Sequence, residues 1–96
     1  MSEKNQKPLR EVINQMLRAY GLGDKIDEIS LIKSWEEVVG KMIARHTSDI
    51  YFKAGVLYIK LDSSTVRQEL SYAKSSLIEN LNRKAQKRMV SDIIFK

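Results

Sequence analysis

Apolar side chains recur at helical spacing in the first part of the chain. Pro8 suits the first turn of a helix, where its missing N–H would have no partner in any case. The apolar positions that follow share one face and are Leu9, Val12, Ile13, Met16, Leu17 and Tyr20. This spacing predicts a helix over residues 8–20, with a turn at Gly21 and Gly23 after it. We expect residues 1–7, which are polar, to be flexible.

A second helical pattern follows between residues 24 and 43. Its apolar face holds Leu31, Ile32, Trp35, Val38, Val39, Met42 and Ile43. Ile26 lies on the opposite side, which predicts a bend near residues 28–30 and either one long helix or two short ones. Gly40 marks a helix end or a close approach of two backbone segments. Trp35 is in phase with its apolar neighbours, which favours a core anchor over an interface hot spot.

The period changes to strict alternation from Asp49 onward. One face of the predicted hairpin holds Ile50, Phe52, Leu57, Ile59 and Leu61, and the other holds Val56, Tyr58 and Lys60. The connection is predicted as residues 53–55, which end in a glycine suited to a left-handed turn conformation. The sequence therefore predicts two antiparallel strands.

The last third of the chain predicts one more helix and one more strand. Thr65 and Gln68 have the spacing of a capping box. The apolar stripe that follows is Val66, Leu70, Ala73, Leu77 and Leu81. This pattern loses phase after Asn82, so the helix is expected to fray in residues 83–88. Val90, Ile93 and Phe95 predict a third strand, with Ile94 on its other face.

These elements predict a small two-layer α+β fold in the order α-α-β-β-α-β, with a three-stranded sheet packed on helices. Tyr51, Val56, Tyr58 and Ile94 fall on the outer face of that sheet. A face this apolar predicts a covering helix or a partner, and two copies of the chain could pair through it. Tyr51 and Tyr58 are therefore candidate contact residues.

Composition limits the function more than it identifies it. With 96 residues the chain is predicted to form a single domain, residues 1–96. The absence of cysteine excludes disulfides, Cys-ligated metal sites and a thiol nucleophile, and it fits a reducing compartment, so the cytoplasm is expected. No apolar run reaches the length of a membrane span, and no signal-peptide pattern is present.

The sequence lacks the common motifs of catalysis. It contains neither a P-loop nor the GxGxxG of dinucleotide-binding proteins, so no nucleotide cofactor is expected. His46 is the only histidine, and an isolated histidine of this kind is more often a surface or capping residue than a metal ligand or a general base. We therefore predict that the chain is not an enzyme and that it binds no metal.

A basic tract near the end of the chain is the main candidate for binding chemistry. The net charge of the whole chain is +5, and the candidate nucleic-acid contacts are Lys74, Arg83, Lys84, Lys87 and Arg88. In one interpretation these cations offset the negative end of a helix dipole and keep the surface hydrated. In the other, they contact phosphates while an exposed tyrosine stacks on a base. The sequence leaves both interpretations open, with the first slightly favoured.

An ordered series of short motifs resembles the bacterial DciA-like family. The series comprises WEEVVG at residues 35–40, IARHT at 43–47, GVLYI at 55–59, Ser63-Ser64, Glu69-Leu70 and Leu81-Asn82. The resemblance covers residues 8–96 and implies a KH-like fold, a bacterial intracellular location, no ATPase activity and a role in loading or stabilising a DnaB-type replicative helicase on DNA. Trp35, Val39, Gly40 and His46 match the family motif and are structural or partner-binding residues. The GxxG loop of true KH modules is missing, so binding through that loop is not carried over.

Taken together, these features predict a non-enzymatic adaptor in DNA replication. Its expected partners are a DnaB-type helicase and, more weakly, single-stranded DNA bound through residues 74–88. The alternatives are a KH-like RNA-binding module, or a protein-interaction domain that binds no nucleic acid and whose charge only keeps it soluble.

Overall fold

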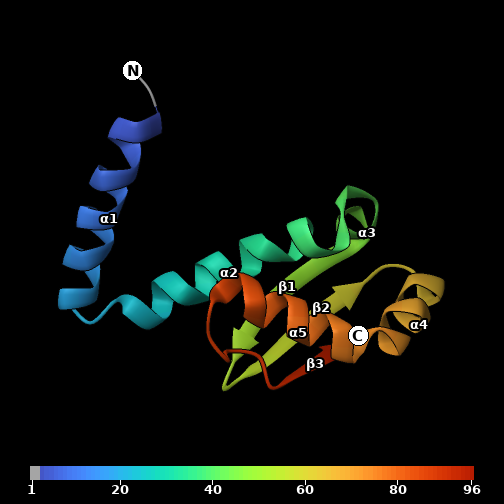
Figure 1. Cartoon of the computed structure of the whole chain (residues 1–96). Helices are drawn as coiled ribbons and strands as arrows, with labels where there is room; N and C mark the ends of the chain where they lie inside the picture. Colours follow the sequence, from blue (N-terminus) through green and yellow to red (C-terminus); the bar gives the residue numbers. More distant parts are fainter. Residues whose placement is uncertain (1–2) are drawn as a thin grey trace.

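The computed structural model of the chain describes residues 3–96, and the side chains of residues 8–96 (Figure 1). The element order is α1 (Glu3–Ala19), α2 (Gly23–Val39), α3 (Lys41–Arg45), β1 (Thr47–Lys53), β2 (Val56–Leu61), α4 (Ser64–Tyr72), α5 (Lys74–Ala85) and β3 (Asp92–Phe95). Helices and strands pack as two layers, so the predicted small α+β fold is confirmed.

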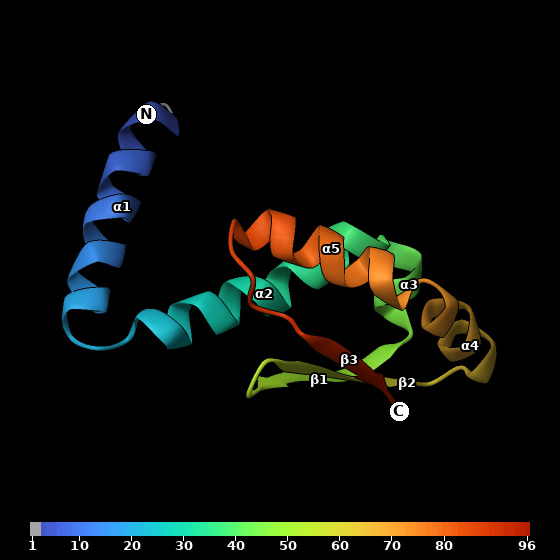
Figure 2. The ribbon, with the colours of Figure 1, turned by 60° about the horizontal axis from the view of Figure 1, so that its bottom comes forward.

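The sheet has the order β1-β2-β3, with β2 in the centre. Strands β1 and β2 are antiparallel, as a hairpin requires, whereas β3 pairs with β2 in parallel after the chain has returned through α4 and α5. Helices α2 and α5 lie side by side over one face of the sheet, and no helix of residues 3–96 covers the other face (Figure 2). Alternation along the strands therefore divides their side chains between a buried face and an open face.

The core forms where the inward face of the sheet meets the apolar stripes of the helices. The buried residues are Leu31, Trp35, Leu57, Ile59, Leu61, Leu70, Leu77, Leu81, Val90 and Ile93. The inward orientation predicted for Leu57, Ile59 and Leu61 is confirmed. Trp35 lies in this core, where its indole N–H donates a 3.0 Å hydrogen bond to the Thr47 hydroxyl at the start of β1. The buried indole therefore fastens α2 to the sheet.

The first helices differ from the prediction at two places. Helix α1 begins at Glu3 rather than at Pro8, which lies inside it. The expected flexibility of residues 1–7 stays a prediction, and residues 1 and 2 lie outside the described residues. Helix α2 runs through residues 28–30 without a break, and the division of the predicted segment falls at Gly40 instead, where the short helix α3 follows. Gly40 ends α2 with φ of +88°, so its prediction as a helix end is confirmed.

The hairpin connection is shorter than predicted. Lys53 pairs with Val56, which leaves only Ala54 and Gly55 in the turn, and both have positive φ. Two-residue turns of this kind match the natural twist of paired strands better than the predicted three-residue connection does.

The helix predicted after the hairpin is divided into two helices, α4 and α5. The cap lies within residues 62–65, which were expected to hold it as a run of N-cap residue types: the Ser63 hydroxyl accepts a 3.2 Å hydrogen bond from the backbone N–H of Val66. The capping-box spacing of Thr65 and Gln68 does not supply the cap. The chain bends at Ala73 although the apolar stripe continues in phase across it. Residues 83–85 remain helical, and α5 ends at Gln86 in the left-handed conformation instead of fraying after Asn82.

Asn82 holds the connection between α5 and β3, a role that the sequence analysis missed. Its side-chain oxygen accepts hydrogen bonds from the backbone N–H groups of Met89 (3.0 Å) and Val90 (2.8 Å), and its amide donates to the Val90 carbonyl at 3.0 Å. Val90 is thereby buried in the connection, and β3 begins only at Asp92.

Candidate nucleic-acid and partner interfaces

Most of the predicted basic tract is paired with carboxylates of the chain itself. Lys74 lies 3.3 Å from Asp92, and Arg83 lies 2.9 Å from Glu79 one helical turn away. Lys84 pairs with Glu37 of α2, and Lys87 pairs with Asp27 of the same helix. Among the five predicted cations, Arg88 alone has no ion pair within residues 8–96. The tract is therefore largely committed to holding α5 and its flanking loop against the rest of the fold.

The structure brings only part of the tract together. Arg83, Lys87 and Arg88 line a shallow groove of about 830 Å³ at the end of α5. Lys84 turns instead toward α2, and Lys74 lies at the opposite end of α5, roughly 13 Å from Arg83 along the helix axis. The five cations do not form one continuous basic face.

Asp27 is the centre of the ion pairs that join α1, α2 and the loop after α5. Its carboxylate accepts from Arg18 at 2.7 Å and from Lys87, and its side chain is only 14% exposed. These two cationic hydrogen-bond donors lower the pKa of Asp27 to about 2, and the same contact raises the pKa of Arg18. Asp27 is therefore ionised under all physiological conditions and links three elements.

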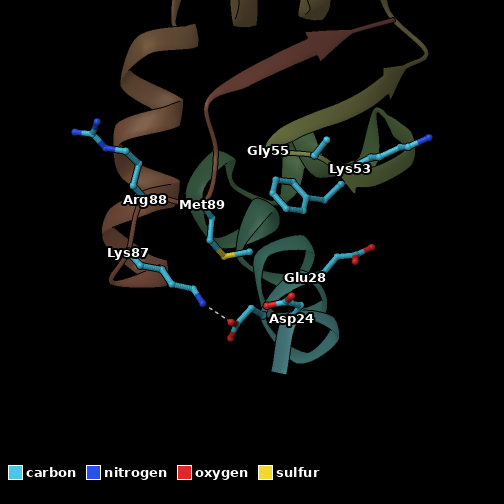
Figure 3. Close-up of a pocket in the computed structure, with 10 residues that line it drawn as sticks. Asp24, Glu28, Lys53, Gly55, Lys87, Arg88 and Met89 are labelled. Carbon is cyan, nitrogen blue, oxygen red and sulfur yellow. Dashed lines mark hydrogen bonds and ion pairs between the residues drawn. The ribbon is translucent and has the colours of Figure 1, made fainter. Parts of the chain in front are cut away.

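A cleft of about 580 Å³ opens beside this carboxylate (Figure 3). Asp24 and Glu28 come from α2, Lys53 comes from the hairpin, and Lys87 and Arg88 come from the loop after α5. Lys87 turns toward the acidic residues of α2 and pairs with Asp27, whereas the side chains of Arg88 and Lys53 extend away from the cleft (Figure 3). The cleft contains no arrangement of nucleophile and base, and its mixed charge does not favour a phosphate-rich ligand.

The open face of the sheet carries an aromatic pair. Tyr51 of β1 and Tyr58 of β2 are directly opposite in register, and their rings stack with centroids 4.6 Å apart and planes within 10°. Ile94 of β3 is the next residue in the same row, and it is exposed. The row therefore crosses all three strands, as the alternation predicted.

Lysines surround this aromatic pair. The Lys96 ammonium lies 5.7 Å from the centre of the Tyr51 ring and 5.2 Å from that of Tyr58, distances typical of cation–π contacts. Lys53 follows Tyr51 by two residues on β1, and Lys60 follows Tyr58 by two residues on β2, so each lysine lies on the same face as its tyrosine. Neither lysine has an ion pair within residues 8–96. The sequence analysis placed Lys60 on this face but did not use it. The sequence does contain the signal for this arrangement, because each of the three lysines lies two residues after a residue of the outer face: Tyr51, Tyr58 or Ile94.

The acidic residues on the same face are engaged locally. Asp49 accepts a 2.9 Å hydrogen bond from the backbone N–H of Ile50. Asp92 accepts from the backbone N–H of Ile93 at 2.8 Å and pairs with Lys74, and both contacts lower its pKa. The cations of the face are thus less neutralised than those of α5.

Helix α1 and the residue after it present a second open surface. It is here called the α1 stripe and consists of Leu9, Val12, Ile13 and Met16 of the helix and Tyr20, which follows its last turn. Leu9 is 60% exposed and Met16 is 55% exposed, although both lie on the apolar face of an amphipathic helix. Figures 1 and 2 show the reason, since α1 stands away from the sheet and from α5 and meets only the start of α2. The radius of gyration is accordingly 15.1 Å, against about 12.5 Å for a compact domain of this length.

The four residues of the predicted family motif lie in the second half of α2 and at the two ends of α3. Trp35 is buried, and Val39 is half-buried against the core. Gly40 has open space around it, so its positive φ, rather than a close contact, is what requires glycine. His46 Nδ1 hydrogen-bonds to Asp62 at 2.7 Å, which ties the start of β1 to the end of β2. These positions favour a structural role for the motif.

A sequence profile of the family described as "Dna[CI] antecedent, DciA" matches residues 8–95. The chain belongs to this family. Membership implies a role like that of a loader of the DnaB-type replicative helicase, which is the role of an adaptor rather than of an enzyme. No curated protein matches the chain significantly.

The described residues of the DciA-family chain contain neither a membrane-spanning helix nor a metal-binding cluster. No helix in the described part of the chain is long and apolar enough for a bilayer crossing. Within the same residues, no group of three or more His, Asp or Glu side chains is placed to hold a metal ion.

Proposed function

We propose that this DciA-family chain is a non-enzymatic adaptor that docks on a DnaB-type helicase through the α1 stripe and binds single-stranded DNA weakly. The family match supports the helicase as partner. The exposure of the α1 stripe supports the docking surface, because an amphipathic helix whose apolar face is unpartnered is suited to lie in a hydrophobic groove of another protein.

The α1 stripe is large enough to supply useful binding energy. The five apolar side chains of the stripe are each between 46% and 79% exposed. Together they form a contiguous apolar patch, and a patch of this kind often marks an interaction site on a soluble protein. Burying one such side chain fully contributes about 1.5–3 kcal/mol relative to leaving it exposed. The ion pair between Arg18 and Asp27 orients the end of α1 on the body, so the stripe is presented at a defined angle.

The proposed mechanism uses binding energy alone. The sequence has no P-loop, so ATP hydrolysis on this chain does not drive the process. Such an adaptor shifts a helicase only by binding one of its conformations more tightly than another. Contacts that favour the ring arrangement able to admit DNA are sufficient for loading.

Two further expectations accompany this proposal. We propose a KH-like domain over residues 1–96. The elements follow in the order α3-β1-β2-α4-α5-β3 and form a mixed three-stranded sheet with helices on one face, and the α4–α5 junction is where we expect the GxxG loop of a KH module. The junction reads Tyr72-Ala73-Lys74 and lacks those glycines, so nucleic acid is expected to bind elsewhere. A replication role also leads us to propose a cytoplasmic location.

A mixing experiment with the purified replicative helicase of the same cell tests the docking surface. Met16→Ser removes an apolar contact from the α1 stripe and is expected to weaken capture of the helicase at least tenfold. Met42→Ser is the matched control, because Met42 is 76% exposed on α3 at the other end of the molecule. Equal loss in both variants, or in neither, contradicts docking through α1. Light scattering of the chain alone shows whether a second copy occupies the surface instead.

A further inference from the structure

The open face of the sheet combines stacked rings with unpaired cations. Each ring of the Tyr51–Tyr58 pair has one face on its neighbour, at a centroid distance of 4.6 Å, and one face turned away from it. The Tyr51 side is the more accessible, since this residue is 42% exposed at the edge strand β1. A planar ligand placed on that free face extends the existing stack by one layer.

The charge of this face complements a polyanion. Lys96 lies above both rings and donates a 3.5 Å hydrogen bond to the Tyr51 hydroxyl, so its ammonium is fixed beside the aromatic pair. Lys53 and Lys60 carry no ion pair within residues 8–96. The face also carries two carboxylates: Asp92 pairs with Lys74, and Asp49 lies opposite Lys60 in the strand register. The three lysines therefore still outnumber the one carboxylate that has no ion pair within residues 8–96.

The size of the row fits a short stretch of nucleic acid. The row Tyr51–Tyr58–Ile94 spans two strand spacings, about 10 Å, on a side of the sheet that none of the described helices covers (Figure 2). Aromatic rings on an open sheet, with cations around them, form a platform on which unpaired bases stack regardless of sequence. Duplex DNA hides its base faces and has no equivalent surface to offer.

We infer that the outer sheet face binds single-stranded DNA, with a base stacked on the free face of the Tyr51–Tyr58 pair and with phosphates contacted by Lys53, Lys60 and Lys96. This inference rests on the proposed function, because it gives the single-stranded DNA of that function a site. It also moves the site away from α5, where four of the five predicted cations are held by carboxylates.

Fluorescence anisotropy with a labelled single-stranded oligonucleotide tests the stacking. The double variant Tyr51→Ala, Tyr58→Ala is expected to bind at least tenfold more weakly than the unmodified chain. Tyr51→Phe keeps the ring and is expected to bind within about twofold of the unmodified chain. Tyr72→Ala is the matched control, because Tyr72 is 78% exposed on α4 and lies outside the sheet. Unchanged binding in the double variant, with its fold confirmed by circular dichroism, overturns the inference.

Salt dependence and the choice of ligand test the rest of the site. Lys53→Gln and Lys60→Gln are each expected to reduce the slope of log K against log salt by about 0.7, the value for one phosphate contact on a single strand. A duplex of the same sequence is expected to bind at least tenfold more weakly, and equal binding of the duplex overturns stacking. Single-stranded RNA of equal length is the comparison that distinguishes the two nucleic acids. Binding of RNA tenfold tighter than DNA overturns the assignment to DNA.

The same variants separate this inference from the helicase proposal. The tyrosine double variant is expected to capture the helicase as well as the unmodified chain does, because the α1 stripe is intact. Helicase capture without any tyrosine-dependent DNA binding overturns the inference and leaves the docking proposal standing. Tyrosine-dependent DNA binding without helicase capture supports the inference and contradicts the docking proposal.

Discussion

Helices α1 and α5 carry the same kind of apolar pattern and have opposite surroundings. In α5, Leu77 and Leu81 lie against the sheet and are buried, and Leu81 is completely so. In α1, Leu9 and Met16 occupy equivalent positions on an apolar stripe and remain more than half exposed. The difference shows that helical spacing of apolar residues identifies the face that needs a partner, but does not say whether that partner belongs to the same chain.

The lysines show a similar contrast, because some are paired with carboxylates of the chain and others are not. Lys84 and Lys87 lie in the basic tract and pair with carboxylates of α2. Lys53 and Lys60 are separated from each other in sequence and have no such pairs within residues 8–96. A cluster of cations in the sequence can therefore serve the fold, whereas dispersed cations that meet on one face remain free for a ligand.

The contrast between the buried stripe of α5 and the exposed stripe of α1 predicts the largest difference in stability when one leucine of each is truncated to alanine. Leu81→Ala leaves a cavity in the core and is expected to reduce the free energy of unfolding by about 3 kcal/mol. Leu9→Ala removes an exposed side chain, and its effect is expected to stay within about 0.5 kcal/mol. Urea denaturation of both variants provides the values. Equal destabilisation would show that α1 packs on the body in solution.

Removing the Asn82 side chain tests how the loop beside the paired cations is held. Asn82→Ala leaves the backbone N–H groups of Met89 and Val90 without their partner, and a reduction in unfolding free energy of about 2 kcal/mol is expected. Asn80→Ala on the same helix is the control, because Asn80 contacts only the exposed Arg83. Urea denaturation that finds the two variants equally stable contradicts the role given to Asn82.

The ion pairs at Asp27 predict a pH-dependent link between α1 and the body. The folded pKa of about 2 lies below the ordinary 3.8, so the unfolded state binds more protons between these values and the contribution to stability is present above about pH 4. Asp27→Asn is expected to lose about 1–2 kcal/mol at neutral pH. The gap between variant and unmodified chain should narrow as the pH falls toward 2. A gap that is constant from pH 6 to about pH 2.5 contradicts the assignment.

Two glycines with positive φ offer the smallest and most specific test. Gly40→Ala places a Cβ at φ of +88° between α2 and α3 of the body, and a loss of about 1 kcal/mol is expected in thermal unfolding because of the backbone conformation alone. Gly21 has φ of +83° in the turn between α1 and α2, also with open space around it. If α1 unfolds independently of the body, Gly21→Ala leaves the main transition unchanged. A loss as large as that of Gly40→Ala would show that α1 and the body unfold together.

The fold was largely predictable, because each buried stripe has a clear period. The alternation of Leu57, Ile59 and Leu61 identified the inner face of β2, and Gly40 identified a helix end. The bend at Ala73 was not predictable, because neither proline nor glycine marks it and the stripe stays in phase on both sides. The two-residue turn at Ala54 and Gly55 was missed, since alanine rarely adopts a positive φ.

The candidate sites were predictable only in part. Tyr51 and Tyr58 were placed on one face by alternation, and the structure adds that their rings stack. The pairing of Lys84 with Glu37 and of Lys87 with Asp27 joins residues far apart in sequence, and no local pattern announces such contacts. The exposure of the α1 stripe was not predictable either, because it depends on the angle between α1 and α2, which no local sequence pattern determines.

The central claim is that the open α1 stripe is where this adaptor meets the replicative helicase. Its most direct test is a titration of the purified helicase with the unmodified chain, Met16→Ser and Met42→Ser, followed by sedimentation velocity under identical buffer conditions. The account predicts that the unmodified chain and Met42→Ser co-sediment with the helicase at the same concentrations, and that Met16→Ser requires at least ten times more protein. Co-sedimentation of Met16→Ser at the concentrations of the unmodified chain would contradict it.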